Sequence, residues 1–321
     1  MRGFRGIPYA EPPLGPHRFR PHVTKKPEAH VVSATYFGSS CIQLDTGAPT
    51  VYTQYLQGFL LTPGQQQAED CLTLNFRAPR VVLNQSLLVM IYLPGGAFAR
   101  GGSASPYKYG EEIVRAHQDV VVVSVKQVLS HQAYTADHTN YRLNIFGFPN
   151  AAALDGHNLN PGFLDQRKAV EWLHYEIAAF GVDPTRMVFW DQSAGAASVD
   201  KYTYAWNDDP LVRGFILDSG TTDGFALGGQ GITNFTYVAE QVNCTQQDED
   251  SMRECMQCAD ADAIISVLDK YNTTANGGVT LSFGPVADNE TSFSNYTDRR
   301  RRGLFAQLVR LSLFRPLLLL D

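Results

Sequence analysis

Short apolar runs separated by turn-forming and polar residues are the clearest signal along this chain. An unbroken apolar run of four to seven residues is typical of a strand that is covered on both faces. The stretch Leu72–Phe76 alternates between apolar and polar residues instead, which also predicts a strand. The unbroken runs are Leu87–Leu93, Val120–Val125, Arg186–Trp190 and Gly214–Leu217.

One segment between these runs has the period of a helix. Asp165–Phe180 carries apolar residues three and four positions apart, with Pro161 near its start and Gly181 and Pro184 at its end. A strand, a helix and a strand in succession imply right-handed crossovers and a mainly parallel sheet. The sequence therefore predicts an α/β protein, with helices and loops but few strands after residue 220. The apolar positions of the helix are Val170, Leu173, Ile177 and Phe180.

Ser193 stands between the run that ends at Trp190 and a segment of small helix formers that begins at Ala194. Gly195 follows two residues after the serine. A serine on a tight turn between a strand and a helix is the arrangement of a nucleophile elbow, whose usual pattern is G-x-S-x-G. Here the first glycine is replaced by Asp191, at a position where a side chain crowds the neighbouring elements.

A glycine-rich turn follows the run at Leu87–Leu93. Its sequence is LPGGAF, and paired glycines after a strand let backbone amides approach a ligand closely. We expect the amides of Gly96 and Ala97 to stabilise an oxyanion together with the amide of Ala194. An ordinary glycine-rich turn is the alternative.

No histidine follows Ser193. In the chain order of this type of site, the nucleophile comes first, the acid second and the histidine third. An upstream histidine would reach Ser193 only if the chain abandoned that topology, so we expect none of the eight to act as the base. They are His17, His22, His30, His117, His131, His138, His157 and His174.

Composition narrows the class of protein. With 321 residues, 44% of them hydrophobic and 18% charged, the chain suits a globular protein of one large or two smaller domains. A net charge of −6 argues against a nucleic-acid partner, and Arg299–Arg302 is the one basic cluster. No apolar run reaches the roughly 18 residues of a membrane-spanning helix, so we expect no transmembrane segment.

Cysteines and sequons point to the secretory route. The cysteines suggest the pairs Cys41–Cys71 and Cys244–Cys255, with Cys258 left free, although spacing alone does not establish pairing. The chain begins MRGFRGIPYA, without the apolar core of a signal peptide. We expect a secreted protein whose signal peptide is absent from this sequence. The N-x-[ST] sequons, candidate glycosylation sites, start at Asn84, Asn234, Asn243, Asn272, Asn289 and Asn295.

The segment 308–321 mixes leucine runs with arginine and has no clear amphipathic face. A basic, membrane-anchoring helix is one interpretation, but Pro316 would break it. We favour a translated frameshift or a mis-spliced exon, and we treat 308–321 as an aberrant tail.

Several motifs resemble those of the type B carboxylesterase/lipase family, and the resemblance extends from Gly3 to about Gln307. The segment from Phe180 to Gly195 resembles the serine signature of that family. The other matching motifs are Phe4–Ala10 with Pro12–Gly15, Glu69–Asn75, Asn140–Arg142, Asn160–Gln166, and Phe283–Val286 with Asp288.

This resemblance implies an α/β-hydrolase fold that hydrolyses carboxylic esters through an acyl-enzyme at Ser193. The oxyanion donors that it implies are Gly96, Ala97 and Ala194. It supports both cysteine pairs and secretion. No metal or organic cofactor is expected, and the expected substrate is a small-molecule or lipid ester.

The chain also departs from the family pattern. Val182 and Asp191 replace family glycines, and the family's acid and histidine should follow Gln307, where only Asp321 is acidic. We therefore expect residues 1–307 to form a partial α/β-hydrolase domain that lacks its last strands and leaves a sheet edge unpaired.

Two hypotheses follow. The first is a fragment of a secreted ester hydrolase that turns over little substrate, because it lacks a general base. The second is a non-catalytic binding or adhesion module of the same fold. The first is favoured because Ser193 and the glycine-rich turn are both retained.

Overall fold

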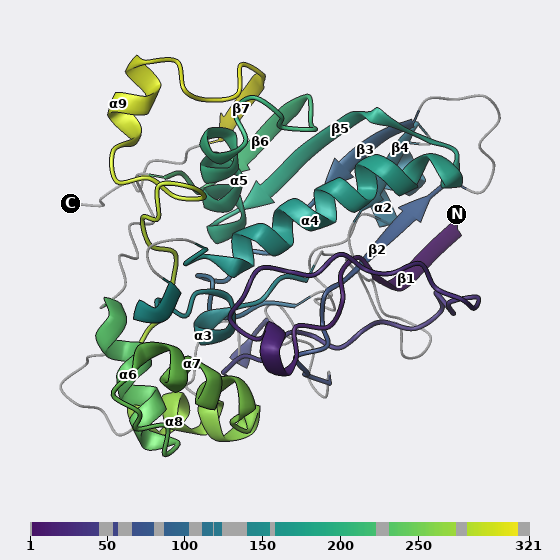
Figure 1. Cartoon of the computed structure of the whole chain (residues 1–321). Helices are drawn as coiled ribbons and strands as arrows, with labels where there is room; N and C mark the ends of the chain where they lie inside the picture. Colours follow the sequence, from purple (N-terminus) through teal and green to yellow (C-terminus); the bar gives the residue numbers. More distant parts are fainter. Residues whose placement is uncertain are drawn as a thin grey trace.

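A mostly parallel sheet lies at the centre of the computed structural model (Figure 1). Within the described residues the sheet has seven strands: β1 (Arg2–Pro8), β2 (Thr73–Ala78), β3 (Leu87–Ile91), β4 (Val120–Val123), β5 (Val182–Gln192), β6 (Gly214–Asp218) and β7 (Val309–Leu313). Their order is β1-β2-β4-β3-β5-β6-β7. The structure describes residues 2–44, 54–56, 66–79, 87–102, 111–117, 119–123, 140–154, 158–222, 231–273 and 281–313.

The parallel part of the sheet is built from the apolar runs of the sequence. β1–β2 and β2–β4 are antiparallel, whereas β4, β3, β5, β6 and β7 run parallel to one another. Val89, Ile91 and Phe189 are fully buried, as expected of strands that are covered by other elements. The predicted α/β class is therefore confirmed.

Helices α4 and α5 lie in front of the sheet in Figure 1, and both contact β5. The helix predicted for Asp165–Phe180 is present as α4 and the short η3 that continues it. None of the helices in the described ranges is both long and apolar enough to cross a bilayer. The described helices are α2 (Glu111–Ala116), α3 (Asn144–Gly147), α4 (Pro161–Glu176), α5 (Ala194–Ala205), α6 (Gly231–Gln241), α7 (Glu249–Cys258), α8 (Ala261–Thr273) and α9 (Tyr296–Arg301), with the 3-10 helices η1 (Gly15–His17), η2 (Ala152–Leu154) and η3 (Ile177–Phe180).

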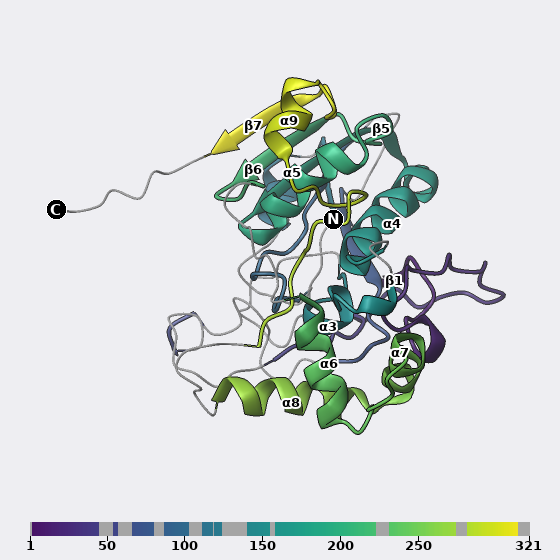
Figure 2. The ribbon, with the colours of Figure 1, turned by 60° about the vertical axis from the view of Figure 1, so that its left-hand side comes forward.

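A second hydrophobic cluster is formed by α6, α7 and α8, which lie below the sheet in Figures 1 and 2. Phe235, Met256 and Leu268 are buried at its centre. Arg18 connects this cluster to the rest of the chain, because its guanidinium donates to the carbonyl oxygen of Met256 at 2.7 Å and forms an ion pair with Glu69 at 2.6 Å.

Both cysteine pairs suggested by the sequence are disulfides in the structure. Cys41–Cys71 closes a loop of 30 residues, and Cys244–Cys255 closes one of 11 residues. Cys258 is free and exposed. Cross-links of this kind are typical of proteins that fold in an oxidising compartment.

Part of the expected tail belongs to the sheet. Residues 309–313 form β7, which pairs in parallel with β6 from Gly214↔Val309 to Asp218↔Leu313. The guanidinium of Arg310 lies 3.0 Å from the carboxylate of Asp200, which is fully buried. The strand therefore covers an edge that the sequence analysis expected to be open, and residues 314–321 lie outside the described residues.

A buried ion pair fixes α4 to the segment that precedes it. The Arg142 guanidinium donates to both carboxylate oxygens of Asp165, at 2.8 and 2.7 Å, and the Arg142 amide donates to the same carboxylate at 3.1 Å. Both side chains are almost completely excluded from solvent, at 3% and 0% exposure. Removing one partner of such a pair leaves an uncompensated charge in the interior.

We predict that Arg142→Met lowers the free energy of unfolding by about 3–5 kcal/mol, because it leaves the Asp165 carboxylate buried without a cation. Urea-induced unfolding followed by circular dichroism measures this loss. The matched control is Arg302→Met, which removes an ion pair between two exposed side chains (Arg302 and Asp298) and should cost less than about 1 kcal/mol. Equal losses in the two variants would contradict the prediction.

Candidate active site

Ser193 lies at the corner between β5 and α5. Its backbone has φ 59° and ψ −127°, a conformation that non-glycine residues adopt rarely and that is associated with functional sites. The Ser193 amide donates to the carbonyl oxygen of Asp218 at 2.9 Å, and its carbonyl oxygen accepts from the amide of Ala197 at 2.9 Å. The corner is therefore held from the end of β6 and from the first turn of α5.

Two glycines allow this corner to pack closely. A Cβ atom on Gly195 would collide with the carbonyl oxygen of Leu93, and one on Gly220 would collide with the carbonyl oxygen of Ser193. Because neither collision could be relieved without moving backbone, both positions require glycine. Gly195 thus brings the strand-to-helix corner directly against the end of β3.

The glycine-rich turn after β3 lies beside the serine. A Cβ atom on Gly95 would lie 3.1 Å from the Ser193 Cβ and 2.5 Å from the Gln192 carbonyl oxygen. Gly96 has φ 130°, and its carbonyl oxygen accepts hydrogen bonds from the amides of Ala99 and Arg100, both at 3.1 Å. The amides of Gly96 and Ala97 thus belong to a turn that packs against Ser193.

Side chains from distant parts of the sequence brace this turn. The Tyr141 hydroxyl donates to the Pro94 carbonyl oxygen at 2.9 Å. The Gln43 side-chain amide donates to the carbonyl oxygen of Gly101 at 2.8 Å and accepts from the Gly101 amide at 2.7 Å. Tyr141 belongs to a motif that the sequence analysis identified, but the role of Gln43 was not predicted. Gln43 lies 58 positions before Gly101 in the chain, and a single glutamine carries no local signal of such a contact.

An acyl-transfer site has three parts, and the residues predicted for two of them, the nucleophile and the oxyanion donors, lie in neighbouring elements of this structure. Ser193 is half-buried at the carboxyl end of β5, and Ala194 is the first residue of α5, where helix amides have no partner inside the helix. The turn that contains Gly96 and Ala97 packs against Ser193 through Gly95. The role of the Gly96, Ala97 and Ala194 amides as oxyanion donors remains a prediction.

A general base would be the third part. Among the histidines in the described ranges, none forms a hydrogen bond with Ser193. These histidines are His17, His22, His30, His117 and His174, whereas His131, His138 and His157 lie outside the described residues. The serine signature alone gives no indication of how Ser193 would be activated.

Asp191 occupies the first glycine position of the elbow pattern, and its side chain is fully buried. One carboxylate oxygen accepts a hydrogen bond from the amide of Leu93, at the base of the glycine-rich turn. In the described part of the chain the other oxygen has no hydrogen-bond partner. Burial raises the pKa of Asp191 well above its usual range, because the charged form loses its hydration.

The six sequons lie in different environments. Asn243, Asn289 and Asn295 are exposed, Asn234 and Asn272 are half-buried, and Asn84 lies outside the described residues. The Asn234 side-chain amide donates to the Ser282 carbonyl oxygen at 2.8 Å, and the Asn272 side-chain oxygen accepts from the Leu281 backbone amide at 2.8 Å. Glycosylation remains a prediction, and the three exposed asparagines are its best candidates.

Asp191 should make stability depend on pH. Because its pKa is raised in the folded state, the folded protein binds a proton that the unfolded chain releases above about pH 4, so stability falls as pH rises from there toward the folded-state pKa. Asp191→Asn cannot ionise, so its stability relative to the parent should grow with pH across that window, by at most about 1.4 kcal/mol per pH unit.

Urea unfolding between pH 4 and pH 8 measures this difference. The matched control is Asp208→Asn, which removes an exposed carboxylate and should give a curve parallel to the parent. Parallel curves for the parent and Asp191→Asn would show that the Asp191 carboxyl is ionised equally in the folded and unfolded states.

Known proteins are similar to this chain along most of its length. The profile of the Carboxylesterase family matches residues 1–302. The chain is 40% identical to a chlorogenic acid esterase of Aspergillus niger, over 96% of this chain and 56% of that relative. It is 35% identical to secreted lipase 5 of Gibberella zeae, over 93% and 57%, and 31% identical to a cholinesterase of Mus musculus, over 90% and 45%. The chain spans about half the length of these relatives. A family profile along nearly the whole chain and relatives at this identity confirm the resemblance of the motifs: the chain belongs to the carboxylesterase family.

Proposed function

We propose that the protein is a carboxylic ester hydrolase that acts through an acyl-enzyme at Ser193. The observation that carries this proposal is the strained conformation of Ser193 at the strand-to-helix corner, against the glycine-rich turn. Relatives named esterase and lipase support the same reaction class.

The proposed reaction has two halves. The Ser193 oxygen attacks the ester carbonyl carbon, and the amides of Gly96, Ala97 and Ala194 stabilise the charge on the carbonyl oxygen. Collapse of this intermediate breaks the bond to the alcohol, which leaves with a proton. Water then attacks the acyl group on Ser193, releases the carboxylic acid and restores the hydroxyl.

Each half requires a group that accepts and returns a proton. The 321 residues contain no histidine after Ser193. A positioned base typically contributes a factor of roughly 10²–10⁴. We therefore expect a polypeptide of this sequence to hydrolyse esters slowly, through its oxyanion donors and substrate binding alone.

The proposed substrate is a small-molecule or lipid ester. The named relatives include a chlorogenic acid esterase and a secreted lipase. We further propose that the protein is secreted, since its two disulfides suit an oxidising compartment.

Chemical rescue tests the role of Ser193. We predict that millimolar imidazole, as a free base, raises the rate of p-nitrophenyl butyrate hydrolysis at least about tenfold above the slow basal rate. Release of p-nitrophenol is followed by absorbance, and the rate in imidazole without protein is subtracted. Ser193→Ala should lose the rescue while keeping the parent's circular dichroism spectrum.

Equal rates for the parent and a folded Ser193→Ala variant in imidazole would contradict the proposal and favour the alternative of a binding or adhesion module. Turnover without imidazole at the rate of the Aspergillus relative, abolished by Ser193→Ala, would mean that a base is already present.

Glycosylation is tested separately. We predict that protein secreted from a eukaryotic host loses mass on digestion with an N-glycosidase, because Asn243, Asn289 and Asn295 are exposed sequons. Replacing these three asparagines by glutamine should remove most of the mass shift. An unchanged mass after digestion of the secreted parent would contradict glycosylation.

A further inference from the structure

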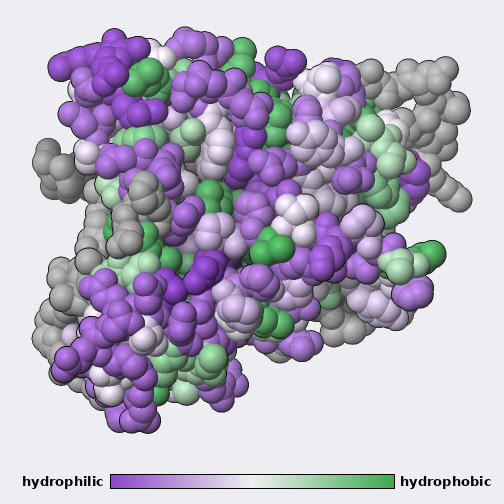
Figure 3. Space-filling view, in the orientation of Figure 1, coloured by the Kyte–Doolittle hydropathy of each residue, from purple (hydrophilic) through white to green (hydrophobic). Residues whose placement is uncertain are grey.

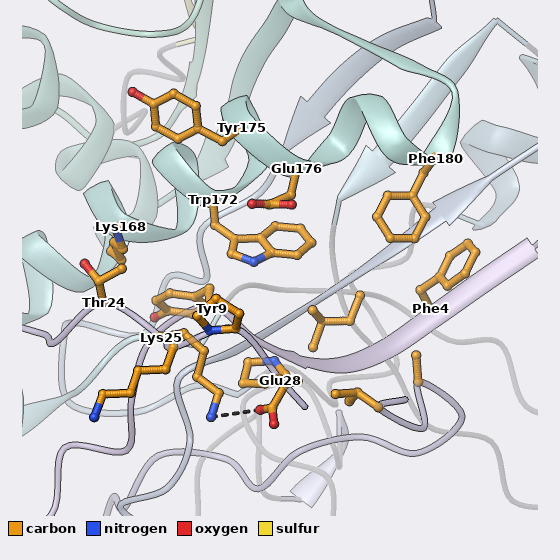
Figure 4. A pocket seen from close by; sticks show the side chains of 16 residues that line it. Phe4, Tyr9, Thr24, Lys25, Glu28, Lys168, Trp172, Tyr175, Glu176 and Phe180 are labelled. Atoms are coloured by element: carbon orange, nitrogen blue, oxygen red, sulfur yellow. Dashed lines mark ion pairs between the residues drawn. The ribbon is translucent and has the colours of Figure 1, made fainter. Parts of the chain in front are cut away.

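A groove of about 660 Å³ lies between α4, β1 and the loop of residues 24–34 (Figure 4). This volume is within the range of small-molecule binding sites, roughly 300–1,000 Å³. None of the residues that line it belongs to the Ser193 corner or the glycine-rich turn. It is therefore a concave site separate from the Ser193 corner, at the β1 edge of the sheet.

The groove is long rather than round. One wall consists of residues from the same side of α4 and η3, four positions apart: Lys168, Trp172, Glu176 and Phe180. From the rise per residue of the two helix types, this wall is roughly 20 Å long. A linear ligand fits such a shape better than a compact one.

The two ends of the groove differ in chemistry. Figure 4 shows Phe4 and Phe180 together at one end, Lys25 and Lys168 on the other side, and Trp172 between them. The rings of Phe4 and Phe180 lie 4.9 Å apart in edge-to-face contact, which makes this end apolar and aromatic. Val32, 43% exposed, belongs to the opposite wall.

Two of the three lysines at the basic end already have carboxylate partners. Lys25 lies 2.9 Å from Glu28 and 3.5 Å from Glu11, and Lys168 lies 3.4 Å from Glu171. Lys26 is exposed, and its backbone amide donates to the Glu11 carboxylate at 2.9 Å, but no carboxylate of the described residues lies within 4.0 Å of its ammonium group. Lys26 therefore offers one positive charge to a ligand.

The surrounding surface favours a small ligand over a protein partner. On the face shown in Figure 3, hydrophobic residues form small separate patches among hydrophilic ones. Protein interfaces usually require a broader contiguous area, whereas a narrow groove with an aromatic end and a lysine-bearing end suits a small amphiphile.

We propose that this groove binds a long-chain alkyl carboxylate. The alkyl chain lies along Trp172 toward Phe4 and Phe180, and the carboxylate lies at Lys26. The site is separate from Ser193, so binding requires neither ester hydrolysis nor the nucleophile.

Isothermal titration calorimetry with sodium dodecanoate, kept below its micelle concentration, tests the proposal on the whole chain. The cationic analogue dodecyltrimethylammonium has the same alkyl chain with the opposite charge. We expect dodecanoate to bind with the higher affinity, and Ser193→Ala to leave that affinity unchanged.

Two pairs of surface variants locate the site. Lys26→Glu should weaken dodecanoate binding about five- to tenfold, and Arg20→Glu, the same charge change on an exposed side chain that does not line the groove, should have no effect. Val32→Asp should weaken binding about tenfold or more, and Val31→Asp, at a neighbouring side chain that is 99% exposed and does not line the groove, should have no effect.

Several results would overturn the proposal: no measurable binding of dodecanoate, equal or stronger binding of the cationic analogue, or unchanged binding in Lys26→Glu and Val32→Asp. Equal losses in each variant and its control would also overturn it, because the effect would then not depend on the groove. The four surface variants change exposed side chains and leave the core intact, and circular dichroism checks that each is folded.

Discussion

The contact between the end of β3 and the start of α5 is the constraint on which the candidate site depends. Gly195 brings α5 against the carbonyl oxygen of Leu93, and Gly95 brings the glycine-rich turn against Ser193. Because both approaches depend on missing Cβ atoms, backbone packing sets how closely the serine and the glycine-rich turn approach each other. The hydrogen bonds of Tyr141 and Gln43 then hold the turn in place.

Asp191 changes this contact in a way that a glycine could not. Its carboxyl binds the Leu93 amide, so the residue that begins the glycine-rich turn is tied to the strand that carries Ser193. The tie places an ionisable group in the interior two residues from the serine, where its second oxygen has no partner in the described chain. A buried polar atom without a hydrogen bond destabilises the fold, so the added link and the cost of burial oppose each other.

The sequence predicted those parts of the fold and site that depend on local pattern. β3, β4 and β6 follow from unbroken apolar runs, and Ser193 follows from its place between a strand and a helix. β5 begins at Val182, before the predicted start at Arg186, because pairing of Val182 with Leu87 extends the strand through polar residues. Contacts between distant residues, such as that of Gln43 with Gly101, have no periodic signal that could predict them.

β7 illustrates the same limit. Its sequence, VRLSL, alternates apolar and polar residues, which is the period of a strand, but the leucine-rich segment around it obscured that pattern. Pairing with β6 places Arg310 beside the buried carboxylate of Asp200. The arginines of segment 308–321 argued against an ordered element in the sequence, but Arg310 lies within strand β7. Val309 and Leu311 remain largely exposed, at 78% and 51%.

The position of α4 explains how the candidate active site and the proposed groove can both depend on one helix. Its inner side carries Asp165, bound to Arg142, and Gln166, whose amide donates to the Ser198 hydroxyl of α5 at 3.1 Å. Its outer side carries Lys168 and Trp172, which line the groove. Since a helix turns about 100° per residue, residues only a few positions apart face opposite directions, toward the Ser193 helix and toward solvent. The inner contacts fix the helix to the scaffold of the serine, and the outer side chains can therefore vary without disturbing the elbow.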